Sequence, residues 1–456
     1  MVDSVRKRKR EMYSSFAMID RHNTRFSSMK RKRDYENCIV CFDGDNFLLC
    51  DRRGCPNPYH PSCVLKEALC QTEEKLNAST GEDIISTLPD SLIYHILSFL
   101  PTKDAAVTVV LSKRWRPLWL SQLILDFDCK QFSDCFAFCN FLYSVMIRRD
   151  STLPIRSLHL KCFSYGSNIN NFIYETVYDA VMRGVENLNL YARITLPSLI
   201  LSIKTLSVLK LKGLTLKDVA YVHLPSLKVL HLNYVTFTHY DYILKLLSGC
   251  PILKELGTEE LRVELPYSNI PVKSLSNLAI ANISSDHIEF DWIQNVERLR
   301  ATMLIKKLSY TLDRIATFHN LTHLELIVNP PHFQLKWKFE CVIKLLEYCP
   351  KLKVLIMEED TWLNKIYEED WEEPQTIPKC ILSHLTKCVL RNFKGINCEV
   401  HFAKYILQNS RALRFMTIQS SMDTDVRLMD TDVRLKILKE LSLCSKNSAA
   451  CKLLFI

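Results

Sequence analysis

Apolar and polar positions follow a recurring pattern of the form L-x-x-L-x-L, with Val, Ile or Met in some of the apolar places. The alternation at the end of each copy has the two-residue period of a strand that buries one face. Each copy therefore predicts a short strand. The copies begin at Val185, Leu206, Leu227, Leu275, Leu321, Leu352 and Leu413.

The spacing of these copies predicts a repeat fold. The first three begin 21 residues apart, inside the range of about 20–29 residues that leucine-rich repeats have. Two near-copies, residues 245–256 and 344–355, each predict a helix, a Cys-Pro turn and a strand. Because each unit can bury its apolar face only against its neighbours, we expect an α/β leucine-rich-repeat solenoid over residues 150–365, with parallel strands on its concave side. The alternative is an ordinary Leu-rich α/β domain in which the pattern recurs by chance.

Residues 84–120 carry a different pattern, which predicts three short helices. Pro89 suits the first turn of a helix and Asp90 its positive end, whereas Pro101 would end that helix. Asp104 is expected to begin a second helix, and Ser112 to cap a third. Helices this short bury little surface by themselves, so the apolar stripe on the first is expected to lie against another protein. The stripe consists of Leu92, Ile93, Ile96, Leu97 and Leu100.

The same residues resemble the F-box family. The run L-P-D-x-L-I-x-x-I-L-S-F-L-P-T-K-D-A, followed by L-S-K-R-W, is similar to the plant form of the F-box motif. The resemblance implies a Skp-type adaptor as partner, which joins a cullin scaffold in an SCF-type ubiquitin ligase. The residues that it implies to face the adaptor are Leu88, Pro89, Leu92, Ile93, Ile96, Leu97, Leu100 and Pro101. The alternative is that they pack only on the repeats.

The C-terminal part, residues 366–456, resembles the FBD region of plant F-box proteins with leucine-rich repeats. Trp371, Pro374 and the runs 377–382, 402–407 and 416–418 occur in the order typical of that region, and residues 436–441 and 451–455 fit its end. The combined resemblance therefore covers residues 84–456. It implies a non-catalytic substrate-recognition subunit, in which the F-box binds the adaptor and the repeats bind a substrate protein that the sequence does not identify.

A cluster of cysteines and one histidine in residues 38–70 has the spacing of zinc ligands. Thiolate and imidazole suit a tetrahedral Zn²⁺ in a reducing compartment. The surrounding sequence resembles a PHD finger, which implies two zinc ions and a histone tail as partner. The predicted ligands of the first zinc site are Cys38, Cys41, His60 and Cys63. Cys50 and Cys55 would begin a second site, but no following C-x2-C completes it. We expect one Zn²⁺ to bind here, with a relic segment that no longer folds as the alternative.

The net charge of +9 is concentrated at the N-terminus. Residues 1–37, predicted to be a disordered tail, contain 11 Lys and Arg against 5 Asp and Glu. The remaining residues are nearly neutral, which argues against a nucleic-acid partner. Basic clusters at residues 6–10 and 30–33 are typical of nuclear-import signals, so we expect the nucleus, with the cytoplasm as a further location. Residues 71–83 are polar and predict a linker.

No pattern typical of an enzyme occurs in the sequence. G-x-S-x-G, H-E-x-x-H and the protein-kinase motifs are absent, and no apolar run reaches the roughly 20 residues of a membrane span. Residues 358–373 contain eight acidic side chains, which favours a solvated loop over a contact with a basic partner. Two other hypotheses remain: a chromatin-associated reader that uses residues 38–70, and a repeat scaffold that acts without a ligase.

Overall fold

The computed structural model describes residues 48–49, 58–59, 88–112, 114–163, 167–265, 275–284, 287–304, 316–329, 336–359, 373–420 and 431–456. The chain divides into two compact units, Met1–Ala78 and Ser79–Ile456. In the first unit, β1 (Leu48–Leu49) pairs antiparallel with β2 (Pro58–Tyr59). The basic clusters, the six predicted zinc ligands and the predicted linker lie outside the described residues, so those predictions stay predictions.

Short helices form the N-terminal part of the second unit, which we call the helical module (residues 88–120). They are α4 (Asp90–Ser98), α5 (Thr102–Val107), the 3-10 turn η2 (Thr108–Val110) and α6 (Trp115–Leu120). Pro89 and Pro101 directly precede α4 and α5, where a proline fits because the first N–H groups of a helix have no partner within it. The predicted cap at Ser112 is wrong. Its carbonyl accepts the Trp115 N–H at 3.1 Å, which forms a turn, and α6 begins only at Trp115.

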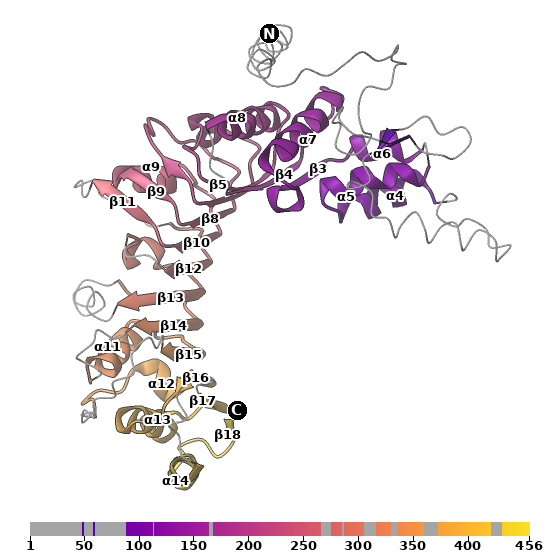
Figure 1. Ribbon diagram of the computed structural model, residues 1–456. Coiled ribbons are helices and arrows are strands. Elements are labelled where there is room, and N and C mark those ends of the chain that lie inside the picture. The colour runs from indigo at the N-terminus through magenta and orange to yellow at the C-terminus, as the bar shows by residue number, and fades with distance from the viewer. Residues whose placement is uncertain are drawn as a thin grey trace, which may run out of the picture. The chain divides into compact units, whose positions relative to one another are not determined.

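Within the described residues, thirteen strands form one sheet whose order follows the chain from β3 to β18 (Figure 1). Every pairing in it is parallel. Figure 1 shows the helices that follow the strands lying along one side of the sheet. The strands are β3 (Ile124–Asp128), β4 (Ser157–Cys162), β5 (Asn187–Ala192), β6 (Val208–Lys212), β8 (Val229–Asn233), β10 (Glu255–Glu259), β12 (Ile280–Ser284), β13 (Arg298–Leu304), β14 (His323–Asn329), β15 (Val354–Glu359), β16 (Lys387–Phe393), β17 (Phe415–Ser420) and β18 (Lys452–Phe455).

In most strands of the sheet alternate side chains are buried, as the pattern predicts, whereas β10, β16 and β17 bury three successive residues. In β6, Leu209 and Leu211 lie in the core, whereas Val208, Lys210 and Lys212 are half-buried on the other face. In six of the seven L-x-x-L-x-L copies, the last two apolar positions are buried residues of a strand.

The strand predicted from the copy that begins at Leu275 is wrong, because the observed strand lies three residues later. The register pairs Leu256 of β10 with Ala281 of β12, and the buried positions are Leu278, Ala281 and Ile283, while Ile280 is exposed. A small alanine occupies the inward place that leucine takes elsewhere, so the motif matched three residues too early.

Helices and turns connect the strands. The two predicted units of helix, Cys-Pro turn and strand are present as α9 with β10 and α11 with β15, and Cys250 and Cys349 are buried in their turns. No helix among the described residues is long and apolar enough to cross a membrane. The connecting elements are η3 (Cys129–Gln131), α7 (Cys135–Arg148), α8 (Ser167–Met182), η4 (Ser198–Ser202), α9 (Asp241–Ser248), η5 (Phe290–Ile293), α11 (Lys336–Glu347), α12 (Lys379–Ser383), α13 (Asn397–Asn409) and α14 (Thr431–Leu443).

A second, smaller sheet accompanies three of the repeats. Its strands β7 (Thr215–Leu216), β9 (Thr236–His239) and β11 (Arg262–Leu265) pair in parallel. The chain enters it through a corner with positive φ directly after β6, β8 and β10. The corner residues are Gly213 (φ 78°), Tyr234 (φ 54°) and Glu260 (φ 49°). Glycine adopts this backbone conformation without strain, whereas tyrosine and glutamate adopt it only with strain.

A buried glutamate organises the C-terminal region. Glu399, in the first turn of α13, is 4% exposed. Its Oε2 accepts the N–H groups of Lys394 at 2.9 Å and Gly395 at 2.8 Å. These bonds hold the turn between β16 and α13, where Gly395 has φ 77°.

Candidate adaptor-docking and substrate-binding surfaces

Helix α4 has two apolar stripes that face in different directions. Ile93 and Leu97 are 0% and 1% exposed, and they lie in the core of a module in which α4 packs against α6. Leu92 and Ile96 are 47% and 42% exposed, and Phe99, directly after the helix, is 73% exposed. Residues four and three apart lie on one side of a helix, so these three side chains form one outward stripe, which we call the α4 stripe.

This arrangement corrects part of the sequence prediction. The resemblance implied that eight residues face the adaptor, but Ile93 and Leu97 are enclosed within the chain and have no surface to offer a partner. Pro89 is exposed, and Leu88, Leu100 and Pro101 are half-buried. Contact of these remaining residues with an adaptor stays a prediction.

Phe99 and Tyr94 were not predicted as site residues. Tyr94 is 37% exposed on α4, and the Phe99 ring packs edge-on against the His95 ring with centroids 4.8 Å apart. The signal for Phe99 was present in the sequence, because it lies seven residues after Leu92 and therefore on the same side of the helix.

Polar contacts close the helical module around α4. Arg114, at the start of α6, donates from Nε to Oδ1 of Asp90 at 2.8 Å. Both side chains are about half exposed (40% and 57%), so solvent screens this ion pair and its net contribution is small.

The module is joined to the first strand of the sheet by specific bonds. The N–H of Asp126 in β3 donates to Oγ1 of Thr102 in α5 at 2.8 Å. Next to it, Nζ of Lys103 donates to the carbonyl of Gln131 at 2.5 Å and lies 4.5 Å from the centre of the Phe132 ring. The helices are thus bonded both to β3 and to the segment that follows it.

A buried arginine, Arg149, makes a further connection between the module and the repeats. It is 3% exposed. Its guanidinium donates to the carbonyl of Leu120, the last residue of α6, at 2.7 Å and to the carbonyl of Pro154 at 3.2 Å. Burial, and then the nearby charge of Arg183, lower the pKa of Arg149 to about 10. The cation is held by carbonyl oxygens and forms no ion pair within the described part of the chain.

The solvent-facing side of the sheet is the candidate substrate surface, because its side chains stand in rows across successive strands. In the C-terminal half, four charges on this face are paired with one another. Arg391 donates to Glu325 at 2.7 Å and to Glu358 at 3.2 Å, and Arg300 lies 3.4 Å from Glu325. Glu358 therefore belongs to a strand and an ion-pair network, rather than to the predicted acidic loop. Residues 360–372 lie outside the described residues.

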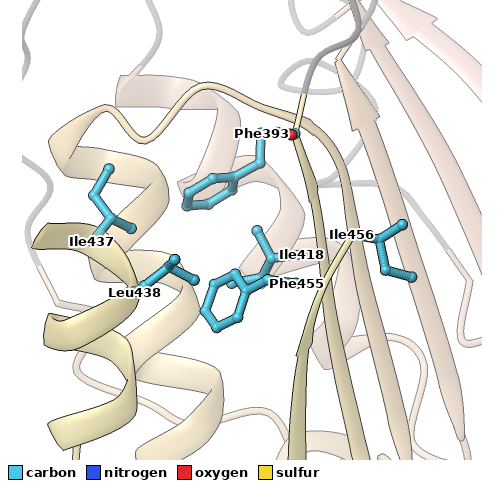
Figure 2. A pocket seen from close by; sticks show the side chains of 7 residues that line it. Phe393, Ile418, Ile437, Leu438, Phe455 and Ile456 are labelled. Carbon is cyan, nitrogen blue, oxygen red and sulfur yellow. The ribbon is translucent and has the colours of Figure 1, made fainter. Parts of the chain in front are cut away.

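A small apolar cavity lies between the C-terminal strands of the sheet and α14. Figure 2 shows Phe393 and Phe455 pointing from the sheet toward Ile437 and Leu438 of α14. The cavity between them has a volume of about 20 Å³, which is far below the roughly 300 Å³ of a small-molecule site. Among the described residues, no group of three or more His, Cys, Asp or Glu side chains could hold a metal ion.

Comparisons with known proteins match most of the chain. The F-box domain model matches residues 85–127, the model of the leucine-rich repeats of FBD-associated F-box protein At5g56370 matches residues 173–314, and the FBD model matches residues 372–418. None of these three ranges includes residues 38–70.

The curated relatives are proteins of Arabidopsis thaliana. FBD-associated F-box protein At4g10400 is 30% identical over 425 residues, which cover 82% of this chain and 100% of that protein. FBD-associated F-box protein At5g56370 is 29% identical over 433 residues, with the same two shares. F-box/FBD/LRR-repeat protein At4g00160 is 29% identical over 449 residues, covering 84% of this chain and 96% of that protein.

Proposed function

Because the chain belongs to the plant family of F-box proteins with leucine-rich repeats and an FBD region, we propose that it is the substrate-recognition subunit of an SCF-type cullin ubiquitin ligase. In this role the chain catalyses no reaction. It brings a substrate protein close to a ubiquitin-transfer centre that another subunit carries.

The α4 stripe is the observation that carries this proposal. Leu92, Ile96 and Phe99 are large apolar side chains on one side of a helix whose other side is fixed in the core. Such a contiguous exposed stripe is typical of a protein-docking site. A Skp-type adaptor is the partner that the F-box implies, with Pro89 and the half-buried Leu88, Leu100 and Pro101 at the margin of the contact.

We further infer that the repeats form the substrate-binding part. Thirteen parallel strands in chain order place one row of side chains beside the next, as in a leucine-rich-repeat solenoid, and the resulting surface is extended rather than pocket-like. The bonds of Thr102 and Arg149 fix the docking helices to the start of this surface.

Co-purification tests the docking. The full chain, co-expressed with a Skp-type adaptor, should retain the adaptor in a one-to-one complex. Leu92→Asp with Ile96→Asp should reduce the retained adaptor by more than about tenfold, because burying unpaired carboxylates in an apolar contact costs several kcal/mol. Ile147→Asp, on α7, is the matched control, since Ile147 is 52% exposed and lies outside the stripe. If the unmutated chain retains no adaptor, the proposal fails.

A zinc site in residues 38–70 and a nuclear location are additional proposals that rest on the sequence alone. The ligand spacing of Cys38, Cys41, His60 and Cys63 supports one Zn²⁺. Metal analysis of the purified full chain should find about one zinc per chain, and Cys38→Ala with Cys41→Ala should remove it. Less than half a zinc ion per unmutated chain would end this proposal, and with it the histone-tail alternative.

A further inference from the structure

Lysine and tyrosine side chains form a patch on the N-terminal half of the sheet. Lys161 of β4, Tyr191 of β5 and Lys212 of β6 are register partners on adjacent strands, so they stand in one row across the solvent-facing side. With strands about 4.8 Å apart, the two lysines are separated by roughly 10 Å. Lys210 lies two residues before Lys212 and therefore on the same face. All four side chains are half-buried.

The lysines of this patch form no ion pair with a carboxylate among the described residues. On the solvent-facing side of β4, β5, β6 and β8 no acidic side chain occurs. None of Lys161, Lys210 and Lys212 lies within 4.0 Å of a described carboxylate oxygen. This differs from the C-terminal half of the same face, where Arg300 and Arg391 are paired with glutamates.

Acidic residues border the patch on both sides. On one side, Asp128 of β3 is the register partner of Lys161, and its Oδ1 accepts the Lys130 N–H at 3.0 Å. Glu259 of β10 ends the same row on the other side, one strand beyond Asn233. On that side, Glu255 of β10 lies 2.8 Å from Nε2 of His231. Three lysines thus remain as a cationic strip between two borders, which favours an anionic partner.

An aromatic residue in a strained conformation stands at the edge of the patch. Tyr234 is 43% exposed and occupies, with φ 54°, the corner that glycine occupies one repeat earlier at Gly213. Its ring lies 5.4 Å from Nζ of Lys212, and its hydroxyl lies 3.2 Å from Glu259. A non-glycine residue with positive φ costs of order 1 kcal/mol or more, and such strain occurs most often at functional sites. Exposed tyrosines are also frequent binding hot spots.

Together these observations identify the chemistry of a partner. We propose that Lys161, Lys210, Lys212, Tyr191 and Tyr234, here called the basic patch, bind an acidic, extended segment of the substrate protein. This inference rests on the proposed function, because it names the substrate feature that the repeats recognise. Carboxylates about 10 Å apart would reach Lys161 and Lys212 at the same time. A polyproline II segment places every third residue on one side at a spacing of about 9.3 Å, which matches that separation.

Binding of two synthetic peptides to the full chain tests the proposal. The probe is a fluorescent 12-residue peptide with Glu at every third position and Pro elsewhere, and its control carries Gln in place of Glu. The Glu peptide should bind at least about tenfold more tightly than the Gln peptide, and 0.5 M NaCl should abolish most of the difference because exposed charges are screened. Equal binding of the two peptides would overturn the proposal.

Matched variants locate the binding site. Lys161→Glu with Lys212→Glu should weaken binding of the Glu peptide by about tenfold or more, whereas Lys353→Glu with Lys387→Glu, which changes the charge equally, should alter it by less than about twofold. Tyr234→Gly should weaken binding without lowering the melting temperature, because glycine relieves the positive φ. If Lys161→Glu with Lys212→Glu leaves binding of the Glu peptide unchanged, the basic patch is not the binding site. Tighter binding of a random-sequence DNA duplex than of the Glu peptide would also refute the proposal.

Adaptor retention, measured on the same protein samples, separates the two proposals. If the chain retains the adaptor but does not distinguish the two peptides, only the basic patch is wrong. If it distinguishes the peptides but retains no adaptor, the ligase function is wrong and the patch serves a scaffold that acts without a ligase.

Discussion

Replacing Arg149 tests how the helical module is attached to the repeats. Its guanidinium donates to the carbonyls of Leu120 and Pro154, and methionine would leave both carbonyls without these donors. An unsatisfied buried carbonyl costs about 1–3 kcal/mol, so the two losses together cost roughly 4 kcal/mol. The buried cation is itself unfavourable, since burial lowers the pKa of Arg149 to about 10, a shift that corresponds to roughly 3 kcal/mol. Arg149→Met should therefore destabilise the protein by only about 1 kcal/mol.

Arg149→Lys should not be milder, although it keeps the charge. A lysine ammonium lacks the fork of donors that reaches both carbonyls, and its burial carries a similar penalty. We expect it to lower the free energy of unfolding by about 2 kcal/mol. The melting temperature and the hydrogen exchange of residues 118–122 and 150–156 measure both effects, with the exposed Arg116→Met as control. If lysine preserves stability while methionine lowers it by more than about 3 kcal/mol, the charge itself is required and the reasoning is wrong.

Three further results are expected. Glu399→Gln should destabilise the C-terminal region by about 1–3 kcal/mol and speed hydrogen exchange at the amides of residues 394 and 395, whereas unchanged exchange would show that the carboxylate is dispensable. Ile93→Ala should lower the free energy of unfolding by about 2–5 kcal/mol, and Leu92→Ala should change it by less than about 1 kcal/mol; equal effects in urea denaturation would contradict the two-faced helix. Burial raises the pKa of Cys250 from 9.0 to about 12, so the stabilisation linked to its protonated thiol is complete below pH 9 and is lost as pH rises toward 12. The free energy of unfolding should then fall less steeply over this range in Cys250→Ala than in the unmutated protein.

Periodicity in the sequence predicted six of the thirteen described strands in their observed positions, because leucine on the inward face leaves a regular signal. The pattern failed where smaller or polar residues take that place, as Ala281 does in β12, Thr258 in β10 and Cys388 in β16. A sheet built by stacking repeats tolerates a smaller or polar residue at an inward position when neighbouring repeats fill the space beside it. Some strands therefore lack the L-x-x-L-x-L motif and cannot be predicted from it. The parallel direction of the strands was expected, but which residues pair between neighbouring strands had to come from the structure.

The docking helix shows a different limit of sequence reasoning. The pattern predicted the helix itself correctly, but a broad apolar stripe does not reveal which of its members face the core. Ile93 and Leu97 are buried, and Leu92 and Ile96 are not. Contacts between distant segments were also beyond prediction, since Arg149 and Glu399 carry no local motif and acquire their roles only through the backbone groups that the fold brings to them.

Purification of the full chain from plant cells, with the proteasome inhibited, tests the central claim most directly. Quantitative mass spectrometry should find a Skp-type adaptor and a cullin in amounts close to that of the chain. Both should be lost together when Leu92→Asp and Ile96→Asp are introduced, while the Ile147→Asp control keeps them. A chain that is recovered folded and abundant, with neither adaptor nor cullin above background, would contradict the claim that it is a ligase subunit.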